Sequence, residues 1–175
     1  MSKLLLHTCC GPCLLGVLSD ETINEFEITS LYYNPNIYPE EEYTRRLDNL
    51  KKVSQEQSLD LIELEYAPKD HAEAIKGLEE DFPRRCLECY RLRLDRTAKE
   101  AINNNYDYFS TTLLVSPYQQ HEKLKEIGEE IGDKYNIKFY YKDFRPFFRK
   151  GQEKAIELEI YRQKYCGCKW SFETN

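Results

Sequence analysis

Short apolar segments alternate with longer charged ones along the whole 175-residue chain, and this alternation constrains the fold more than any other feature. Apolar, β-branched and aromatic runs predict strands at residues 3–8, 27–33, 59–64, 106–114 and 138–141. We expect helices at about 12–19, from Pro39 onward, at 70–78 with Asp70 as cap, at 85–103 after a break at Phe82-Pro83, at 118–134 and at 152–163. This order is typical of a parallel sheet covered by helices on both faces. No internal repeat or linker divides the chain, so we predict one α/β domain over residues 1–175 with a five-stranded parallel sheet.

Ligands bind to such sheets beyond the carboxyl ends of the strands, where the strand order reverses. Cys9 and Cys10 follow the first expected strand, and residues 111–117 follow the fourth. In a 3-2-1-4-5 strand order these two strands are neighbours that flank the reversal. We therefore expect a site where Cys9 and Cys10 lie.

All seven cysteines fall into three tight clusters, which are Cys9, Cys10 and Cys13, then Cys86 and Cys89, then Cys166 and Cys168. Free cysteines that only fill a core are normally scattered along a chain. In a reducing compartment, clustered cysteines indicate metal binding or catalysis more often than structural disulfides. The pattern predicts a metal or redox centre assembled from distant parts of the chain.

Cys86 and Cys89 are three residues apart on an expected helix, so both thiols project from one face about 5–6 Å apart. With Cys9 and Cys10 they offer four sulfur ligands, which suit a structural zinc ion or a [4Fe–4S] cluster. Neighbouring cysteines diverge on an extended backbone and reach separate corners of a cluster more easily than one small ion. The spacing favours iron–sulfur and leaves a zinc site open.

Cys166-Gly167-Cys168 forms a separate unit. A disulfide across one residue is strained and readily reduced, so the pair fits a dithiol–disulfide cycle. Alternatively, the two thiols could bind a second metal and leave one of its coordination positions open for substrate. Cys13, one turn into the first helix, is either a further thiol lining the pocket or a buried residue.

The formal net charge is −6, so no global attraction draws the protein to nucleic acid. Basic residues nevertheless gather in sequence beside the cysteines, for example Arg91 and Arg93, and a local basic face is expected there. No apolar run is long enough for a membrane span, and residues 1–6 are too short for a signal peptide. We expect a cytoplasmic protein without a membrane partner.

Four segments resemble the QueH-type epoxyqueuosine reductase family. They are His7-Thr8-Cys9-Cys10-Gly11-Pro12-Cys13, the run from Arg85 to Leu94 around Cys86 and Cys89, Thr111-Thr112-Leu113-Leu114-Val115-Ser116-Pro117, and Tyr161-Arg162-Gln163-Lys164-Tyr165-Cys166-Gly167-Cys168. The family is similar in fold to the adenine-nucleotide α-hydrolase-like domains. A glycine-rich nucleotide loop is replaced here by Cys9-Cys10-Gly11-Pro12, so the resemblance does not bring ATP use with it.

The resemblance implies two-electron reduction of the epoxide of epoxyqueuosine at the wobble position of tRNA, the final step of queuosine biosynthesis. Cys9, Cys10, Cys86 and Cys89 would hold a [4Fe–4S] cluster. Cys166 and Cys168 would be the redox-active, catalytic pair or would ligate a second, mononuclear iron. The implied partners are the tRNA carrying epoxyqueuosine and an unidentified electron donor, with residues 150–175 closing over the site.

The residues around these motifs suggest further roles. Tyr165, His7 and Tyr118 are the candidate proton donors, although His7 in an apolar strand also fits a core role. We expect charge reversal at Arg91 and Arg93 to weaken tRNA binding, and Tyr90, Phe148 and Trp170 to stack on bases. Two other classes stay open on the residues alone, which are a zinc-stabilised RNA- or protein-binding module and a metal-free thiol–disulfide oxidoreductase.

Overall fold

Five parallel strands form one sheet in the order β3-β2-β1-β4-β5 in the computed structural model, which describes residues 1–174 and side chains as far as Ser171. The strands are β1 (Ser2–His7), β2 (Phe26–Tyr32), β3 (Asp60–Glu63), β4 (Tyr108–Thr111) and β5 (Lys138–Phe139). The α-helices are α1 (Gly11–Val17), α2 (Glu40–Glu56), α3 (Pro68–Ala74), α4 (Phe82–Asn103), α5 (His121–Tyr135), α6 (Phe148–Glu157) and α7 (Lys169–Thr174). Short 3₁₀ turns lie at Glu21–Glu25, Thr112–Val115 and Arg145–Phe147.

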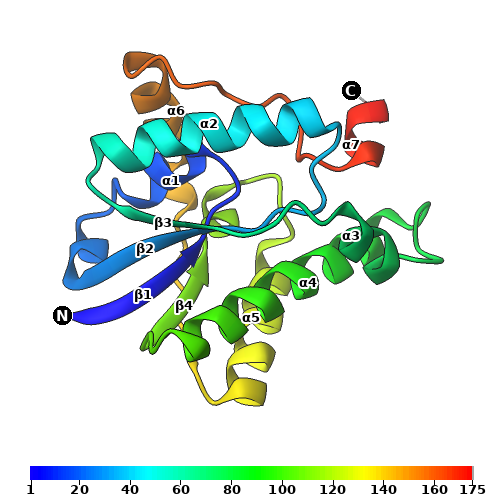
Figure 1. Cartoon of the computed structure of the whole chain (residues 1–175), viewed down its shortest axis with the longest axis horizontal. Coiled ribbons are helices and arrows are strands. Elements are labelled where there is room, and N and C mark those ends of the chain that lie inside the picture. The colour runs from blue at the N-terminus through cyan, green and yellow to red at the C-terminus, as the bar shows by residue number, and fades with distance from the viewer. Residues whose placement is uncertain (175) are drawn as a thin grey trace.

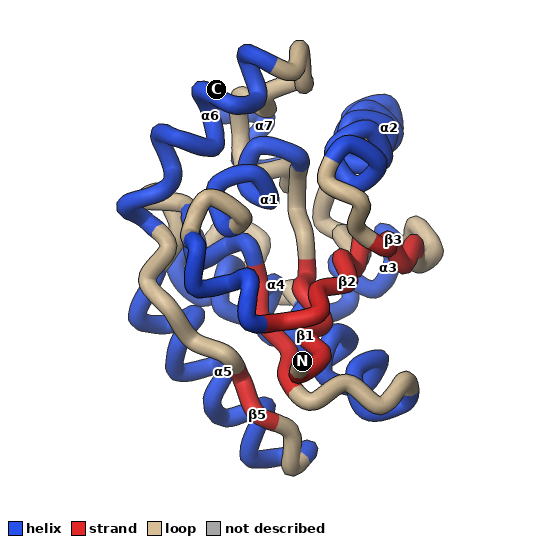
Figure 2. Tube along the Cα trace, turned by 90° about the vertical axis from the view of Figure 1, so that its left-hand side faces the viewer, coloured by secondary structure: helices blue, strands red, loops and turns tan. Residues whose placement is uncertain are grey.

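Helices cover both faces of the sheet, as the alternation predicts. In Figure 1, α1, α2 and α6 lie above the strands, and α3, α4 and α5 lie below them. Figure 2 shows the strands between these two layers when the molecule is turned by 90°. The predicted fold class is confirmed.

The central strand β1 is buried on both faces. Leu4, Leu5 and Leu6 are fully buried, and β1 pairs with β2 on one side and with β4 on the other. The chain runs outward from β1 to β3 and then returns to place β4 on the opposite side of β1. The order therefore reverses between β1 and β4, and their carboxyl ends form the crevice where such sheets bind ligands.

Several predicted boundaries are wrong by a turn or more. The break expected at Phe82-Pro83 lies inside the first turn of α4, because proline is tolerated there and Asp81 caps the helix by accepting from the Arg84 amide. Asp70 is likewise no cap: α3 begins at Pro68 and ends at Ala74, and Asp70 lies in its first turn.

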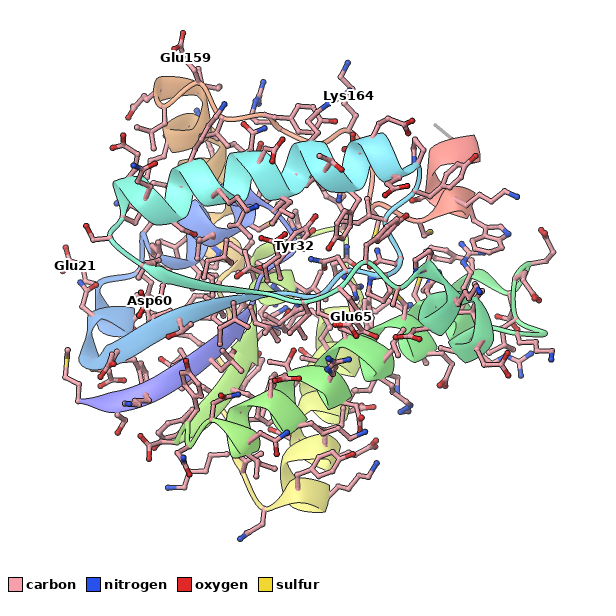
Figure 3. The ribbon with its side chains drawn as sticks, viewed as in Figure 1. Glu21, Tyr32, Asp60, Glu65, Glu159 and Lys164 are labelled. Atoms are coloured by element: carbon pink, nitrogen blue, oxygen red, sulfur yellow. The ribbon has the colours of Figure 1, made fainter. Side chains whose placement is uncertain are left out.

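The fourth strand and the C-terminal helices also differ from expectation. β4 ends at Thr111 instead of 114, because the Thr111 side chain accepts from the Leu113 amide and starts a 3₁₀ turn. The helix expected at 152–163 spans Phe148–Glu157, and residues 158–168 form an irregular segment before α7. In Figure 1 this orange segment runs along α2, and Lys164 projects from it in Figure 3.

Glycine permits the close approach of α6 to α1. A Cβ at Gly151 would lie 2.5 Å from the Pro12 carbonyl oxygen and 2.7 Å from Gly16 backbone atoms. Because these contacts are with backbone, any larger residue would push α6 away from the helix that carries Cys13.

Candidate active site

Three thiols meet at the carboxyl end of β1. The Sγ atoms of Cys9, Cys10 and Cys13 all lie within 4.8 Å of one another, and all three residues are buried. Cys10 is the extended N-cap of α1 and Cys13 lies one turn later, so the two side chains share a face of the helix start. Cys13 is therefore both buried and part of the thiol group. In the described part of the chain, these three cysteines are the only group of three or more potential ligands that lie close enough together to hold a single metal ion.

Hydrogen bonds concentrate negative charge on one of these sulfurs. The neighbouring Cys10 and Cys13 thiols, with Thr112, hold the pKa of Cys9 well below its ordinary value. Burial raises the pKa of Cys10, and the Cys10 and Cys9 sulfurs raise that of Cys13. Gln163 donates an amide hydrogen to Cys10 Sγ at 2.8 Å. The hydrogen bonds thus favour ionisation of Cys9 over that of Cys10 and Cys13.

The second thiol pair is on α4, across the crevice. Cys89 is buried and Cys86 half-buried. Burial, together with the sulfurs of Cys166 and Cys168, raises the pKa of Cys86 to about 11 and that of Cys89 to about 12. The α4 pair therefore lies within the electrostatic reach of the C-terminal pair.

Cys166 and Cys168 are both free thiols, the first exposed and the second buried. Gly167 between them has φ of +132°, a conformation that side chains rarely adopt, and its carbonyl accepts from the Tyr38 amide at 2.7 Å. A Cβ there would lie 3.1 Å from Arg46 Nη1 and from Ile37 Cγ1. Glycine thus lets the pair turn tightly against the loop after β2 and against α2.

One cavity of about 680 Å³ joins these groups. Five of the seven thiols line it, from all three clusters: Cys9, Cys13, Cys86, Cys166 and Cys168. Four cations also line it, namely Arg46, Arg85, Arg162 and Lys164, and no Asp or Glu of the described residues does. The site is therefore locally positive in a chain of net charge −6.

The assignment of Cys9, Cys10, Cys86 and Cys89 to one cluster stays a prediction. Cys9 and Cys86 line the same cavity, from the β1 end and from α4. In a cubane each thiolate binds its own iron, so the four sulfurs need not lie as close together as the ligands of a single ion.

The candidate proton donors differ in setting. His7 is fully buried: its Nε2 lies 3.0 Å from the Tyr33 carbonyl oxygen, its Nδ1 lies 2.9 Å from Thr111 Oγ1, and burial lowers its pKa to about 4. It is a neutral core histidine. Tyr118 and Tyr165 both line the cavity, and the Tyr165 hydroxyl donates to the Tyr38 carbonyl.

The expected basic face is wrong at one residue. Arg93 is only 1% exposed, so it cannot contact tRNA at a surface, whereas Arg91 is half-exposed and pairs with Glu88 and Glu130. Among the expected stacking residues, Tyr90 and Phe148 line the cavity, but Tyr90 is buried and donates to Gln119. Trp170 lies against Arg85 and His71.

Arg46 is the residue that sequence reasoning missed. It is 2% exposed, and it donates to Glu42 Oε1 at 3.0 Å and to the carbonyls of Cys166 and Tyr165 at 3.0 and 2.9 Å. Glu42 also accepts from the Tyr161 hydroxyl at 2.8 Å. These contacts fasten the C-terminal thiol segment to α2, and they join residues about 120 positions apart, which no local pattern signals.

A family model for QueH, described as epoxyqueuosine reductase QueH, matches residues 4–174. The chain belongs to the QueH family. It is 37% identical to the epoxyqueuosine reductase QueH of Thermotoga maritima over 98% of this chain and 91% of that protein. It is 35% identical to the one from Dehalococcoides mccartyi over 97% of this chain and 92% of that protein. The resemblance found in the four segments, three of which bear cysteines, is confirmed.

A solved structure supports the fold alone. A predicted subunit of tRNA methyltransferase from Methanocaldococcus jannaschii superposes with a TM-score of 0.55 at 12% identity, covering 86% of this QueH chain and 76% of its own. None of the described helices has the length and apolar character needed to cross a lipid bilayer.

Proposed function

We propose that this QueH protein reduces the epoxide of epoxyqueuosine at the tRNA wobble position to the alkene of queuosine. Family membership over residues 4–174 supports the activity. The observation that carries the site assignment is the single cavity lined by thiols from all three cysteine clusters, with four cations and no carboxylate of the described residues. A tRNA substrate makes the cytoplasm the expected site of action.

The donor set fits a [4Fe–4S] cluster. All seven thiols are free, and those of the first cluster are buried, where thiolates bind metal without competition from water. We assign the cluster to Cys9, Cys10, Cys86 and Cys89, with Cys13 as the one further thiol beside them. When bound, such a cluster supplies electrons one at a time.

The overall reaction needs two electrons and two protons, because the two C–O bonds of the epoxide break, an alkene forms and the oxygen leaves as water. Cys166 and Cys168 serve either as a dithiol that supplies an electron pair by forming a disulfide or as ligands of a second iron. The Gln119 amide donates to Cys166 Sγ at 3.6 Å, and Ser171 Oγ lies 3.4 Å from Cys168 Sγ. These polar partners orient the pair toward the cavity in either role.

The chain's own groups provide the surface for the tRNA. Arg162 and Lys164 line the cavity and are exposed, so they can meet phosphates beside the modified base. Tyr118 and Phe82 line it as well and are 82% and 62% exposed, which suits stacking on unpaired anticodon bases. We propose that residues 150–175, the last of which lies outside the described residues, close over the site; Arg46 and the Tyr38 amide hold the part around Gly167.

The test compares anaerobically prepared wild type with Cys9→Ala, Cys86→Ala and Cys13→Ala. We measure iron, sulfide and visible absorption, and then count epoxyqueuosine and queuosine nucleosides by mass spectrometry after incubation of modified tRNA with a chemical reductant. The assigned ligand set predicts that Cys9→Ala and Cys86→Ala lose iron and activity while Cys13→Ala keeps its iron. Loss of iron in Cys13→Ala with retention in Cys86→Ala would assign the metal to Cys9, Cys10 and Cys13 instead. Wild type that holds zinc, or no metal, and leaves the epoxide intact would refute the proposal.

A further inference from the structure

Arg93 is a buried cation with no anionic partner. It lies in the middle of α4 and is 1% exposed. Its Nε donates to the Cys89 carbonyl at 3.3 Å, and its buried Nη2 has no hydrogen-bond acceptor. No carboxylate of the described residues forms an ion pair with it, although the chain has 31 acidic residues. A buried charge in this state is costly, so its setting calls for an explanation.

Arg46 shows what a satisfied buried arginine looks like in the same protein. It is 2% exposed and pairs with Glu42 at 3.0 Å, and two carbonyls accept from its other nitrogens. The two arginines belong to α2 and α4, which lie on opposite faces of the sheet (Figure 1). Of these two arginines, only Arg93 forms no ion pair with a described carboxylate.

Cysteine sulfurs are the main groups that favour the charged form of the Arg93 side chain. Burial works against the charged guanidinium, but Cys89, Cys166 and Cys9 more than offset it, so the pKa of Arg93 is raised. The two imidazoles in its field, His7 and His71, carry no charge at neutral pH, because burial and then Arg93 lower the pKa of each to about 4. Arg93 therefore lies within the electrostatic reach of thiols from all three cysteine clusters, and it contacts the Cys89 backbone directly.

We propose that Arg93 is a positioning residue, the counter-cation of the thiolate-bound centre, and that it favours the reduced state of that centre. The inference rests on the proposed function, because it requires a metal held by these thiolates. Each electron that enters such a centre adds negative charge, and a fixed cation close by stabilises the more negative state more strongly. Arg93 would thus raise the reduction potential and hold the electron ready for the epoxide.

The first test is a redox titration of the anaerobic, metal-loaded protein, followed by paramagnetic resonance. Arg93→Gln removes the charge, Arg93→Lys keeps it, and Arg91→Gln is the matched control two residues away on α4. We expect Arg93→Gln to lower the reduced-to-oxidised ratio at a fixed potential about tenfold, or about 59 mV for a one-electron couple. Arg93→Lys should retain most of the wild-type potential, and Arg91→Gln all of it. Equal potentials in wild type and Arg93→Gln would overturn the inference.

The second test separates a counter-charge from a merely structural role. A counter-charge is held more strongly by the negatively charged, loaded centre than by the free thiols, so Arg93→Gln should lower the Tm of loaded protein by more than it lowers the Tm of metal-free protein. A purely structural arginine would lower both alike, and that result would overturn the inference. If folded Arg93→Gln binds no iron while Arg93→Lys does, the positive charge is needed to hold the metal centre, and this result supports the inference. If wild-type protein contains no iron, the proposed cofactor is refuted. If wild-type protein contains iron and Arg93→Gln has the same reduction potential, only the inference about Arg93 is refuted.

Discussion

The buried ion pair of Arg46 and Glu42, both on α2, should anchor the polar contacts that hold the C-terminal thiol segment, because Arg46 donates to the carbonyls of Tyr165 and Cys166 and Glu42 accepts from Tyr161. Both residues are at most 5% exposed, and their charged atoms are 3.0 Å apart. Removing one partner from a buried pair leaves the other charge unpaired and typically costs about 3–5 kcal/mol. Against a total stability of about 5–15 kcal/mol for a domain of this size, the loss is large enough to measure easily.

The two single variants should not cost the same. Glu42→Gln leaves Arg46 its two carbonyl acceptors at Tyr165 and Cys166, so we expect the lower value, about 3 kcal/mol. Arg46→Met also frees those carbonyls, each of which contributed about 1 kcal/mol, so we expect about 4–5 kcal/mol. The double variant buries no unpaired charge, so it should cost at least about 2 kcal/mol less than the sum of the two.

Urea unfolding of the four metal-free proteins gives these free energies of unfolding from the midpoint and its slope. Arg45→Gln is the control: Arg45 also reaches Glu42, at 3.5 Å, but its side chain is 54% exposed, and such pairs contribute about 1 kcal/mol or less. In parallel, alkylation of the buried Cys168 followed by mass spectrometry should be faster in Arg46→Met than in Arg45→Gln. Additivity of the two single variants within about 0.5 kcal/mol would refute the coupling.

Three further predictions concern the thiol segment, the tRNA surface and pH. Gly167→Ala should lower the free energy of unfolding by about 2–3 kcal/mol, because the new side chain is strained and crowds Arg46. The control is Gly77→Ala, at φ of +82° with open space around it, which should cost only about 1 kcal/mol. Equal losses of unfolding free energy in urea would contradict this. Arg162→Gln should weaken tRNA binding and reduce by about 1 the slope of log K for tRNA binding against log salt concentration. The control Arg149→Gln changes a residue that lies outside the cavity and pairs with Glu153, so it should leave this slope unchanged. Filter binding across a salt series measures both slopes. The unfolded chain protonates His71 near pH 6.5 and the folded one near pH 4, so its contribution to stability is complete above pH 6.5 and falls by about 3 kcal/mol as the pH drops to about 4. Metal-free His71→Gln should lose less over that window, and a wild-type pH profile in the variant would contradict the assignment.

The sequence predicted the parts of this fold that depend on local pattern. Leu4, Leu5 and Leu6 mark a strand buried on both faces, and that strand was expected beside the fourth one, which placed Cys9 at the edge where the site lies. The boundary errors have local causes as well. Pro83 reads as a breaker, but it is also acceptable in a first helical turn, and only the Asp81 cap decides between the two.

The spacing of Cys13 in the sequence already indicates its place in the thiol group. Its spacing of three from Cys10 is the same as that of Cys89 from Cys86, and on a helix this spacing places two side chains together. The roles of Arg46, Arg93 and Gln163 had no such signal. Gln163 meets Cys10 across 153 positions of sequence, and the burial of Arg93 is decided by what packs over α4.

The roles proposed for Arg46 and Arg93 account for the unequal pairing of these two buried arginines. On α2 the guanidinium of Arg46 fixes a segment of chain, so it needs permanent partners, and Glu42 with two carbonyls supplies them. On α4 a carboxylate beside Arg93 would neutralise it and cancel its field at the thiols. A cation favours electron entry only if no carboxylate neutralises it. The free-energy cost of burying such a cation must then be offset by its attraction to the negatively charged metal centre. The same reasoning explains why no described carboxylate lines the cavity of this acidic chain: each one would oppose both the reduced centre and the phosphates of the tRNA.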